Sequence, residues 1–335
     1  MIATAAFGQS KDDTPKINLG VVIFADYTYQ ESPEVQDADK NPVNVSSFNI
    51  TRAYINVTGN LNHYLSFRIT PDIARAGNDS ALAGSQVFRL KYAYAQLNLD
   101  DWAPKGSWIR AGITQTPYID YFETLYRYRF QGSVFPDRLG LLTASDAGVA
   151  AHVNFPANYG DLQAGVYNGE GYNHPEVNNQ KALQLRLSIR PLPLGGIWKG
   201  LRVTGFVDDD HYVADARRYR AIEQVTFEHP RVNAGLDVLP SKDQVNVRAA
   251  ELDGHGWSAW ATPRLTNNGW EMLLRHDNFT PDRGDAAQKR NIAGIAYWLQ
   301  GLQRVTSAVM VDYDSLSRAG APNATNYGVK ILISF

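Results

Sequence analysis

Histidine and carboxylate residues that could support acid–base chemistry occur at two places in the sequence. The stretch DDDHY places Asp209 and Asp210 directly before His211, and His152 lies in a segment of alternating polarity. A catalytic histidine needs a partner that holds it at hydrogen-bond distance, and the chain contains neither a G-x-S-x-G nor an H-E-x-x-H motif. An enzyme of the protease or lipase type therefore remains an alternative, but the prediction is a protein without catalytic activity.

The same DDDHY stretch offers hard oxygen ligands that suit a divalent cation. It lies in a predicted loop over residues 208–219, where a solvated acidic loop is the alternative interpretation. The chain has no cysteine, which excludes disulfides and thiolate metal sites. We therefore predict no cofactor and no metal site.

Arginine dominates the basic residues of the chain. The 335 residues include 22 arginines and 10 lysines, with a formal net charge of -2. Arginine presents a fixed fork of donors to anions, whereas lysine presents a mobile point charge. The nearly neutral total charge gives no indication of a nucleic-acid partner.

Most of the chain consists of segments in which apolar and polar side chains alternate. This is the pattern of β-strands with one apolar face. In KALQLRLSIR, Leu183 to Ile189 alternate with Gln184 to Arg190. Each segment has roughly the nine to eleven residues that cross a bilayer at a tilt. Sixteen such segments are predicted, over residues 16–29, 47–59, 63–70, 88–99, 107–116, 147–155, 161–168, 181–190, 201–208, 219–228, 232–239, 256–262, 270–279, 290–299, 305–314 and 326–335.

The connections between these segments alternate between long and short. Residues 31–46 and 71–86 are long connections, whereas residues 100–106 and 229–231 are short ones. This alternation is typical of an up-and-down transmembrane β-barrel with tight turns on one side and long loops outside. We predict an all-β, 16-stranded antiparallel barrel over residues 16–335, preceded by a flexible periplasmic leader over residues 1–15, in the outer membrane of a Gram-negative-type bacterium with both termini periplasmic.

The last predicted strand carries apolar residues at every second position and ends on an aromatic residue. It resembles the carboxy-terminal signal by which the barrel assembly machinery recognises outer-membrane barrels. The assembled barrel would then be surrounded by outer-membrane lipid and lipopolysaccharide. An amphipathic edge strand that happens to end in Phe is the alternative. The predicted signal residues are Tyr327, Val329, Ile331, Ile333 and Phe335.

The connection from Pro117 to Asp146 is the longest, and aromatic residues are interleaved with charged ones along it. Such an aromatic segment would be poorly soluble in water, so we expect it to fold into the barrel as the third outer loop and to set the aperture. Packing over a neighbouring subunit is the alternative. The predicted constriction residues are Tyr118, Asp120, Tyr121, Glu123, Arg127, Arg129 and Arg138.

A barrel of sixteen strands encloses an aqueous lumen, so the polar series of each strand should line water. Basic residues crowd the first half of the chain and acidic residues the second, which predicts a transverse field across the lumen; mutual pairing of these charges is the alternative. The predicted lumen residues are the basic Arg52, Arg68, Arg110, Arg186, Arg190, Arg202 and Arg275, and the acidic Asp26, Asp208, Asp237, Asp277 and Asp312, with Glu228 and Glu271.

The stretches FRLKYAYAQLNL and SWIRAGITQTPYIDYFE, with SDAGVAAH, VYNGEG and WEMLLRHDNFTPD, resemble the phosphate-selective porin O and P family. The resemblance implies a sixteen-stranded outer-membrane channel, often trimeric, whose third outer loop narrows the pore. The family associates phosphate selectivity with an arginine ladder and a lysine cluster near the constriction, whereas residues 117–146 contain no lysine. We predict passive diffusion of small hydrophilic solutes, anions among them; a soluble sugar-binding β-protein and an outer-membrane barrel enzyme are the alternatives.

Overall fold

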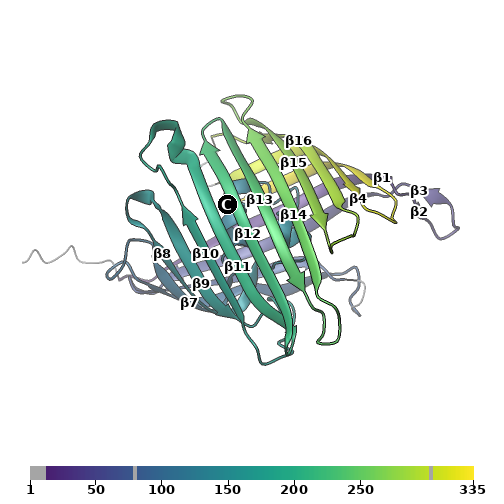
Figure 1. The fold of residues 1–335 in the computed structure, drawn as a ribbon. Helices are drawn as coiled ribbons and strands as arrows, with labels where there is room; N and C mark the ends of the chain where they lie inside the picture. Colours follow the sequence, from purple (N-terminus) through teal and green to yellow (C-terminus); the bar gives the residue numbers. More distant parts are fainter. Residues whose placement is uncertain (1–12, 78–80, 302–304) are drawn as a thin grey trace, which may run out of the picture.

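The computed structural model describes residues 13–77, 81–301 and 305–335 and shows a closed antiparallel barrel of sixteen strands over these ranges (Figure 1). The predicted fold class is therefore confirmed. The predicted leader falls mostly on residues 1–12, which lie outside the described residues. The barrel strands are β1 (Lys16–Ser32), β4 (Ser46–Asn60), β5 (Leu65–Arg75), β6 (Gln86–Asn98), β7 (Trp108–Gln115), β8 (Ser145–Asn154), β9 (Gly160–Tyr167), β10 (Ala182–Ile189), β11 (Leu201–Val213), β12 (Ala216–His229), β13 (Val232–Asp243), β14 (Leu252–Pro263), β15 (Trp270–Thr280), β16 (Gln288–Trp298), β17 (Thr306–Ser317) and β18 (Ala324–Ser334).

The barrel closes by pairing its first strand with its last. β1 pairs antiparallel with β4 on one side and with β18 on the other, where Tyr27 lies opposite Val329 and Ile23 opposite Ile333. Each remaining strand pairs with its neighbours in chain order. Closure satisfies the backbone donors and acceptors of every strand within the sheet, which a bilayer requires because its interior contains no water to bind them.

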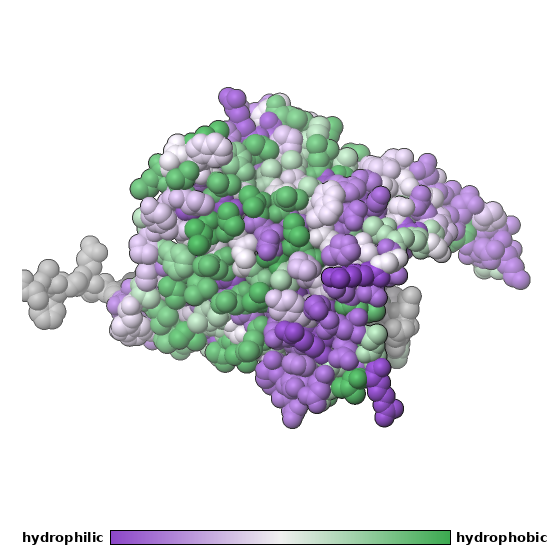
Figure 2. Space-filling model, viewed as in Figure 1, coloured by the Kyte–Doolittle hydropathy of each residue, from purple (hydrophilic) through white to green (hydrophobic). Residues whose placement is uncertain are grey.

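The two faces of each strand differ in polarity as the alternation predicts. In β10, Leu183 and Leu185 are 57% and 43% exposed on the outside, whereas Gln184 and Arg186 are 8% and 3% exposed towards the interior. Figure 2 shows apolar side chains gathered over the β8–β14 face, with hydrophilic side chains towards the loop ends. The apolar series therefore faces outward, and it does not meet a second sheet in a dry interior.

Two features of the connections between strands differ from the prediction. The predicted loop 208–219 is wrong, because β11 and β12 continue through it and leave only residues 214 and 215 between them. Asp209 faces Arg217 at 2.9 Å and Asp210 pairs with Arg218 across the two strands, and cross-strand pairs of opposite charge stabilise a sheet. A small hairpin of β2 (Val35–Gln36) and β3 (Pro42–Val43) within the first long connection was not predicted.

Short helical segments occur only between strands in the described ranges. They are α1 (Ile119–Tyr126), α2 (Phe135–Arg138) and the 3-10 turns η1 (Pro156–Asn158) and η2 (Gly196–Gly200). None of the helices in the part of the chain that the structure describes is long and apolar enough to cross a bilayer.

The outward face of β10 provides a test of this orientation. Replacing Leu185 by Arg places a charge near the middle of an apolar strand face, and we expect the free energy of unfolding to fall by about 2–4 kcal/mol. Val245 is 56% exposed in the connection between β13 and β14, and its replacement by Arg serves as the control. This control should change the free energy of unfolding little. Denaturant unfolding in lipid vesicles measures both, and equal effects of the two variants would contradict an outward, lipid-facing Leu185.

Candidate functional site

The connection between β7 and β8 contacts inward-facing side chains of many strands. Pro117 follows β7, lacks a backbone donor and precedes α1, whose first turn carries Asp120. The helix ends at Arg127, which adopts a left-handed conformation with φ of 65°. That conformation is uncommon outside glycine, and Arg127 is held there by Glu271 at 3.5 Å and by the ring of Trp298 at 4.5 Å.

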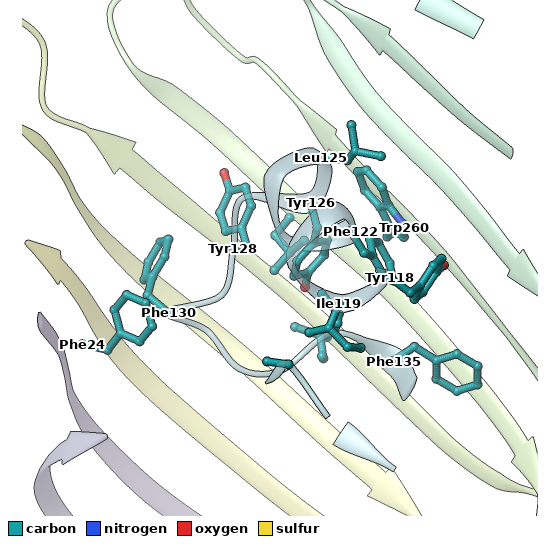
Figure 3. Close-up of a cluster of buried hydrophobic side chains, with 14 of the residues drawn as sticks. Phe24, Tyr118, Ile119, Phe122, Leu125, Tyr126, Tyr128, Phe130, Phe135 and Trp260 are labelled. Carbon is teal, nitrogen blue, oxygen red and sulfur yellow. The ribbon is translucent and has the colours of Figure 1, made fainter. Parts of the chain in front are cut away.

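Aromatic packing holds this connection against the strands. Tyr118, Phe122 and Tyr126 are buried, and the rings of Phe122 and Tyr126 lie 6.0 Å and 5.4 Å from that of Trp260 on β14 (Figure 3). The Phe130 ring, labelled in Figure 3, lies 5.6 Å from that of Tyr128 and 5.7 Å from that of Trp298 on β16. Burying each such side chain stabilises the arrangement by roughly 1.5–3 kcal/mol.

Polar side chains of the same connection bind strands β10 to β17, which we call the anchored wall. Each hydrogen bond contributes about 0.5–1.5 kcal/mol net, more when the partner is charged. The contacts are Tyr118 to Asp237 (2.8 Å), Tyr121 to Thr204 (2.6 Å), Tyr128 to Glu271 (3.1 Å), Gln131 to Asp312 (3.0 Å) and Arg138 to Asp314 (3.2 Å).

Open space lies on the other side of the connection, against strands β1 and β4 to β6. One cavity of about 460 Å³ lies between α1 and these strands, and a second of about 350 Å³ lies between them and residues 129–133. Arg129 borders both cavities. The connection thus contacts the anchored wall through many side chains and borders these two cavities on its other side, and a further cavity of about 400 Å³ lies between residues 135–139 and strands β15 to β17.

The predicted constriction residues divide between these two sides. Asp120, Glu123 and Arg129 border the larger cavity, and Glu123 pairs with Arg129 at 2.7 Å. Burial raises the pKa of Glu123, and the charge of Arg129 opposes that rise. The other four predicted residues bind the anchored wall: Tyr118, Tyr121, Arg127 and Arg138.

The predicted basic lumen residues fall into two groups. Arg52, Arg68 and Arg110, on β4, β5 and β7, have no carboxylate within 4 Å among the described residues; Arg68 binds Asn56 and lies 4.4 Å from the Tyr92 ring. On the anchored wall the arginines are paired: Arg186 with Asp161, Arg190 with Glu228 (3.0 Å), Arg202 with Glu228 (3.1 Å) and Arg275 with Asp277 (2.7 Å).

The predicted acidic lumen residues are mostly buried or paired. Asp237 and Asp312 accept hydrogen bonds from the connection between β7 and β8. Asp208 is 3% exposed, and Asp26 pairs with Lys330 at 3.2 Å. On the anchored wall, Glu228 and Asp277 pair with arginines, whereas Asp26 borders the smaller cavity.

Lys91 and Tyr92 border the larger cavity and were not predicted as lumen residues. Strict alternation would place only one of two consecutive residues inside. The register between β5 and β6 shifts at Pro71, so Lys91 becomes an extra residue and both side chains are buried. Pro71 was the available signal, because proline within a sheet favours bulges.

The histidines singled out in the sequence belong to structural contacts. His152 binds Asp161 at 3.2 Å and stacks on Trp108, while Asp161 also binds Arg186. His211 lies within β11. Among the described residues, no group of three or more His, Cys, Asp or Glu side chains could hold a metal ion.

Comparison with known proteins supplies a family and a set of related folds. The sequence model of the phosphate-selective porin O and P family matches residues 23–222, and no curated protein matches the chain. The anion-selective porin from Comamonas acidovorans is similar over 96% of this chain and 99% of its own, with 9% identity and a TM-score of 0.64. Salmonella typhi OmpF in complex with daunomycin is similar over 97% and 99%, with 13% identity and a TM-score of 0.64. The trimer form of Vibrio cholerae OmpT is similar over 96% and 100%, with 12% identity and a TM-score of 0.56. At these identities the structural likeness concerns the fold.

Removing the hydrogen bond from Tyr118 to Asp237 tests how the connection between β7 and β8 is held against the strands. In Tyr118→Phe, Asp237 and Gln224 lose a buried partner, so we expect the free energy of unfolding to fall by about 1–3 kcal/mol. Amide hydrogen exchange in residues 117–146 should rise as well. Tyr159→Phe is the control, because Tyr159 is 47% exposed; indistinguishable stability and exchange in the two variants would contradict an anchoring role for Tyr118.

Proposed function

The chain belongs to the phosphate-selective porin O and P family and is an outer-membrane porin of a Gram-negative-type bacterium, and we propose that it lets small hydrophilic solutes diffuse passively with a preference for anions. Diffusion requires a hydrated path through the barrel. The preference requires that the charges along this path are not neutralised by their neighbours.

The observation that supports the anion preference is the asymmetry of the interior. Arg52 and Arg68 border the two cavities without carboxylate partners in the described part of the chain, and Lys91 joins them. The arginines of the anchored wall, in contrast, are paired with aspartate and glutamate. The structurally similar Comamonas porin is described as anion-selective, which agrees with this proposal.

The connection over residues 117–146 is proposed as the third outer loop that folds into the lumen and sets the aperture. Its aromatic side chains pack with inward-facing residues such as Phe206 and Trp260, and its polar ones bind residues from β10 to β17. Asp120, Glu123 and Arg129 are the proposed constriction residues, because they face the cavities. Tyr118, Tyr121, Arg127 and Arg138 then position the loop.

We also propose how the barrel assembles with other copies and in the membrane. Vibrio cholerae OmpT, a similar fold, is described in a trimer form, and we infer a homotrimer for this chain. The outward series of β18, which includes Tyr327, Val329 and Ile333, is proposed to contact the barrel assembly machinery, then lipid and lipopolysaccharide. Both termini are proposed to be periplasmic, on the side of the short turns.

Neither alternative function gains support from the geometry. For a barrel enzyme, the nearest candidate is His152 with Asp161, but this carboxylate is shared with Arg186 and Arg202 in an ion-pair network. For a soluble sugar-binding protein, the outward leucines of β10 would be exposed to water. We therefore propose that the protein has no catalytic activity.

Removing two unpaired arginines tests the anion preference. In the double variant Arg52→Gln and Arg68→Gln, we expect the chloride-to-potassium permeability ratio to fall about fivefold, because a charge a few ångströms from an ion contributes on the order of 1 kcal/mol in a water-like medium. Reversal potentials in a KCl gradient across a planar bilayer measure this ratio. The control is Arg248→Gln in the exposed connection between β13 and β14, and an unchanged ratio in the double variant would contradict the proposed path.

A further inference from the structure

The cavity of about 460 Å³ beside α1 brings opposite charges to two sides of one space. Lys91 and Arg68 approach it from β6 and β5, and Asp120 approaches it from α1. Phe24 and Tyr54 supply apolar surface between them. A solute that passes along this wall meets both signs of charge within one cavity.

One cation of this cavity, the Lys91 ammonium, is buried without a counterion among the described residues. The Lys91 side chain is 6% exposed, and its ammonium has no hydrogen-bond acceptor and no carboxylate within 4 Å in the described ranges of the chain. Its Nζ lies 4.8 Å from the centroid of the Tyr54 ring and 5.1 Å from that of Tyr92. Rings stabilise a nearby cation only partly, and a buried charge without a counterion is costly. The ammonium therefore provides a site for an anionic group of a solute.

One carboxylate of the same cavity, that of Asp120, is also incompletely satisfied. Asp120 Oδ1 accepts a hydrogen bond from the Tyr92 hydroxyl at 2.7 Å, and among the described residues the second oxygen of Asp120 has no partner. The neighbouring Glu123 is already paired with Arg129 at 2.7 Å. Tyr92 thus orients Asp120 through its hydroxyl, while its ring lies near both Lys91 and Arg68.

We propose that this cavity binds zwitterionic solutes of the α-amino acid class during their passage through the pore. The carboxylate of the solute binds Lys91 and Arg68, its ammonium binds Asp120, and its side chain lies against Phe24 and Tyr54. The inference rests on the proposed porin function and assigns a solute class to part of the same path.

A zwitterion fits this arrangement better than a simple anion does. An anion on Lys91 would leave Asp120 facing it with the same sign of charge, and like charges in a partly dehydrated space repel. A simple cation on Asp120 would likewise be repelled by the positive charges of Lys91 and Arg68. A solute that carries both groups pairs with both sides, so neither protein charge remains without a partner.

Inhibition of the KCl current by three matched probes tests this site. L-leucine carries both charges, 4-methylpentanoate lacks the ammonium group, and 3-methylbutylammonium lacks the carboxylate. In multichannel planar-bilayer recordings we expect the half-inhibitory concentration of L-leucine to be about tenfold below that of either analogue, which corresponds to one additional charged contact.

Two variants separate the two halves of the site. Asp120→Asn should raise the half-inhibitory concentration of L-leucine about tenfold and leave that of 4-methylpentanoate unchanged or lower, since only the ammonium contact is lost. Lys91→Gln should weaken both probes that carry a carboxylate. Arg248→Gln is the control, and heat-modifiable gel mobility together with open-channel conductance verifies that each variant is folded.

Equal inhibition by L-leucine and 4-methylpentanoate, unaffected by Asp120→Asn, would overturn the zwitterion site and leave the porin assignment intact. Absence of inhibition by all three probes in an open channel would overturn it as well. A folded protein that shows no open-channel current would instead contradict the proposed function.

Discussion

The need to satisfy every backbone donor and acceptor inside a bilayer is the constraint on which the rest of this structure depends. A bilayer interior supplies no water to these groups, so strands can cross it only in a closed sheet. Here closure is achieved where β1 pairs with β18, and each strand then presents one face to the surroundings and one to the lumen. The alternation of Leu183 and Leu185 with Gln184 and Arg186 follows from this geometry, because the side-chain period of a strand is two.

Closure also determines how much space the interior of the barrel has. A barrel of this strand number encloses more space than its own inward side chains occupy. The connection between β7 and β8 contacts inward-facing side chains of the barrel, through aromatic packing on Trp260 and hydrogen bonds such as that from Tyr118 to Asp237. On the side of β4 to β6, Arg68 and Lys91 border a cavity and have no carboxylate within 4 Å in the described residues. We propose that the position of this connection decides which charges of the barrel wall a solute meets.

Much of the barrel could be predicted from the sequence, because alternation is a local property and all sixteen segments show it. Within the barrel strands, local pattern was insufficient at two points. The acidic stretch around Asp209 was predicted to be a loop. It is instead part of β11, because Arg217 of β12 pairs with Asp209 across the sheet. Lys91 was missed because the register shift opposite Pro71 turns two consecutive side chains inward. Which constriction residues face the cavities and which anchor the loop depends on contacts between distant segments, so spacing along the chain could not separate Tyr118 from Asp120.

The most direct test of the account is the accessibility of single cysteines on β4, since the chain contains no native cysteine. Asn56 borders the larger cavity, whereas Ile55 is 37% exposed on the outer face and Val57 shares that face. In lipid bilayers, a charged, membrane-impermeant thiol reagent should modify Asn56→Cys and reduce the open-channel current. It should leave Ile55→Cys and Val57→Cys unmodified. Modification of the two outer positions with protection of Asn56→Cys would contradict a strand that separates lipid from a water-filled lumen.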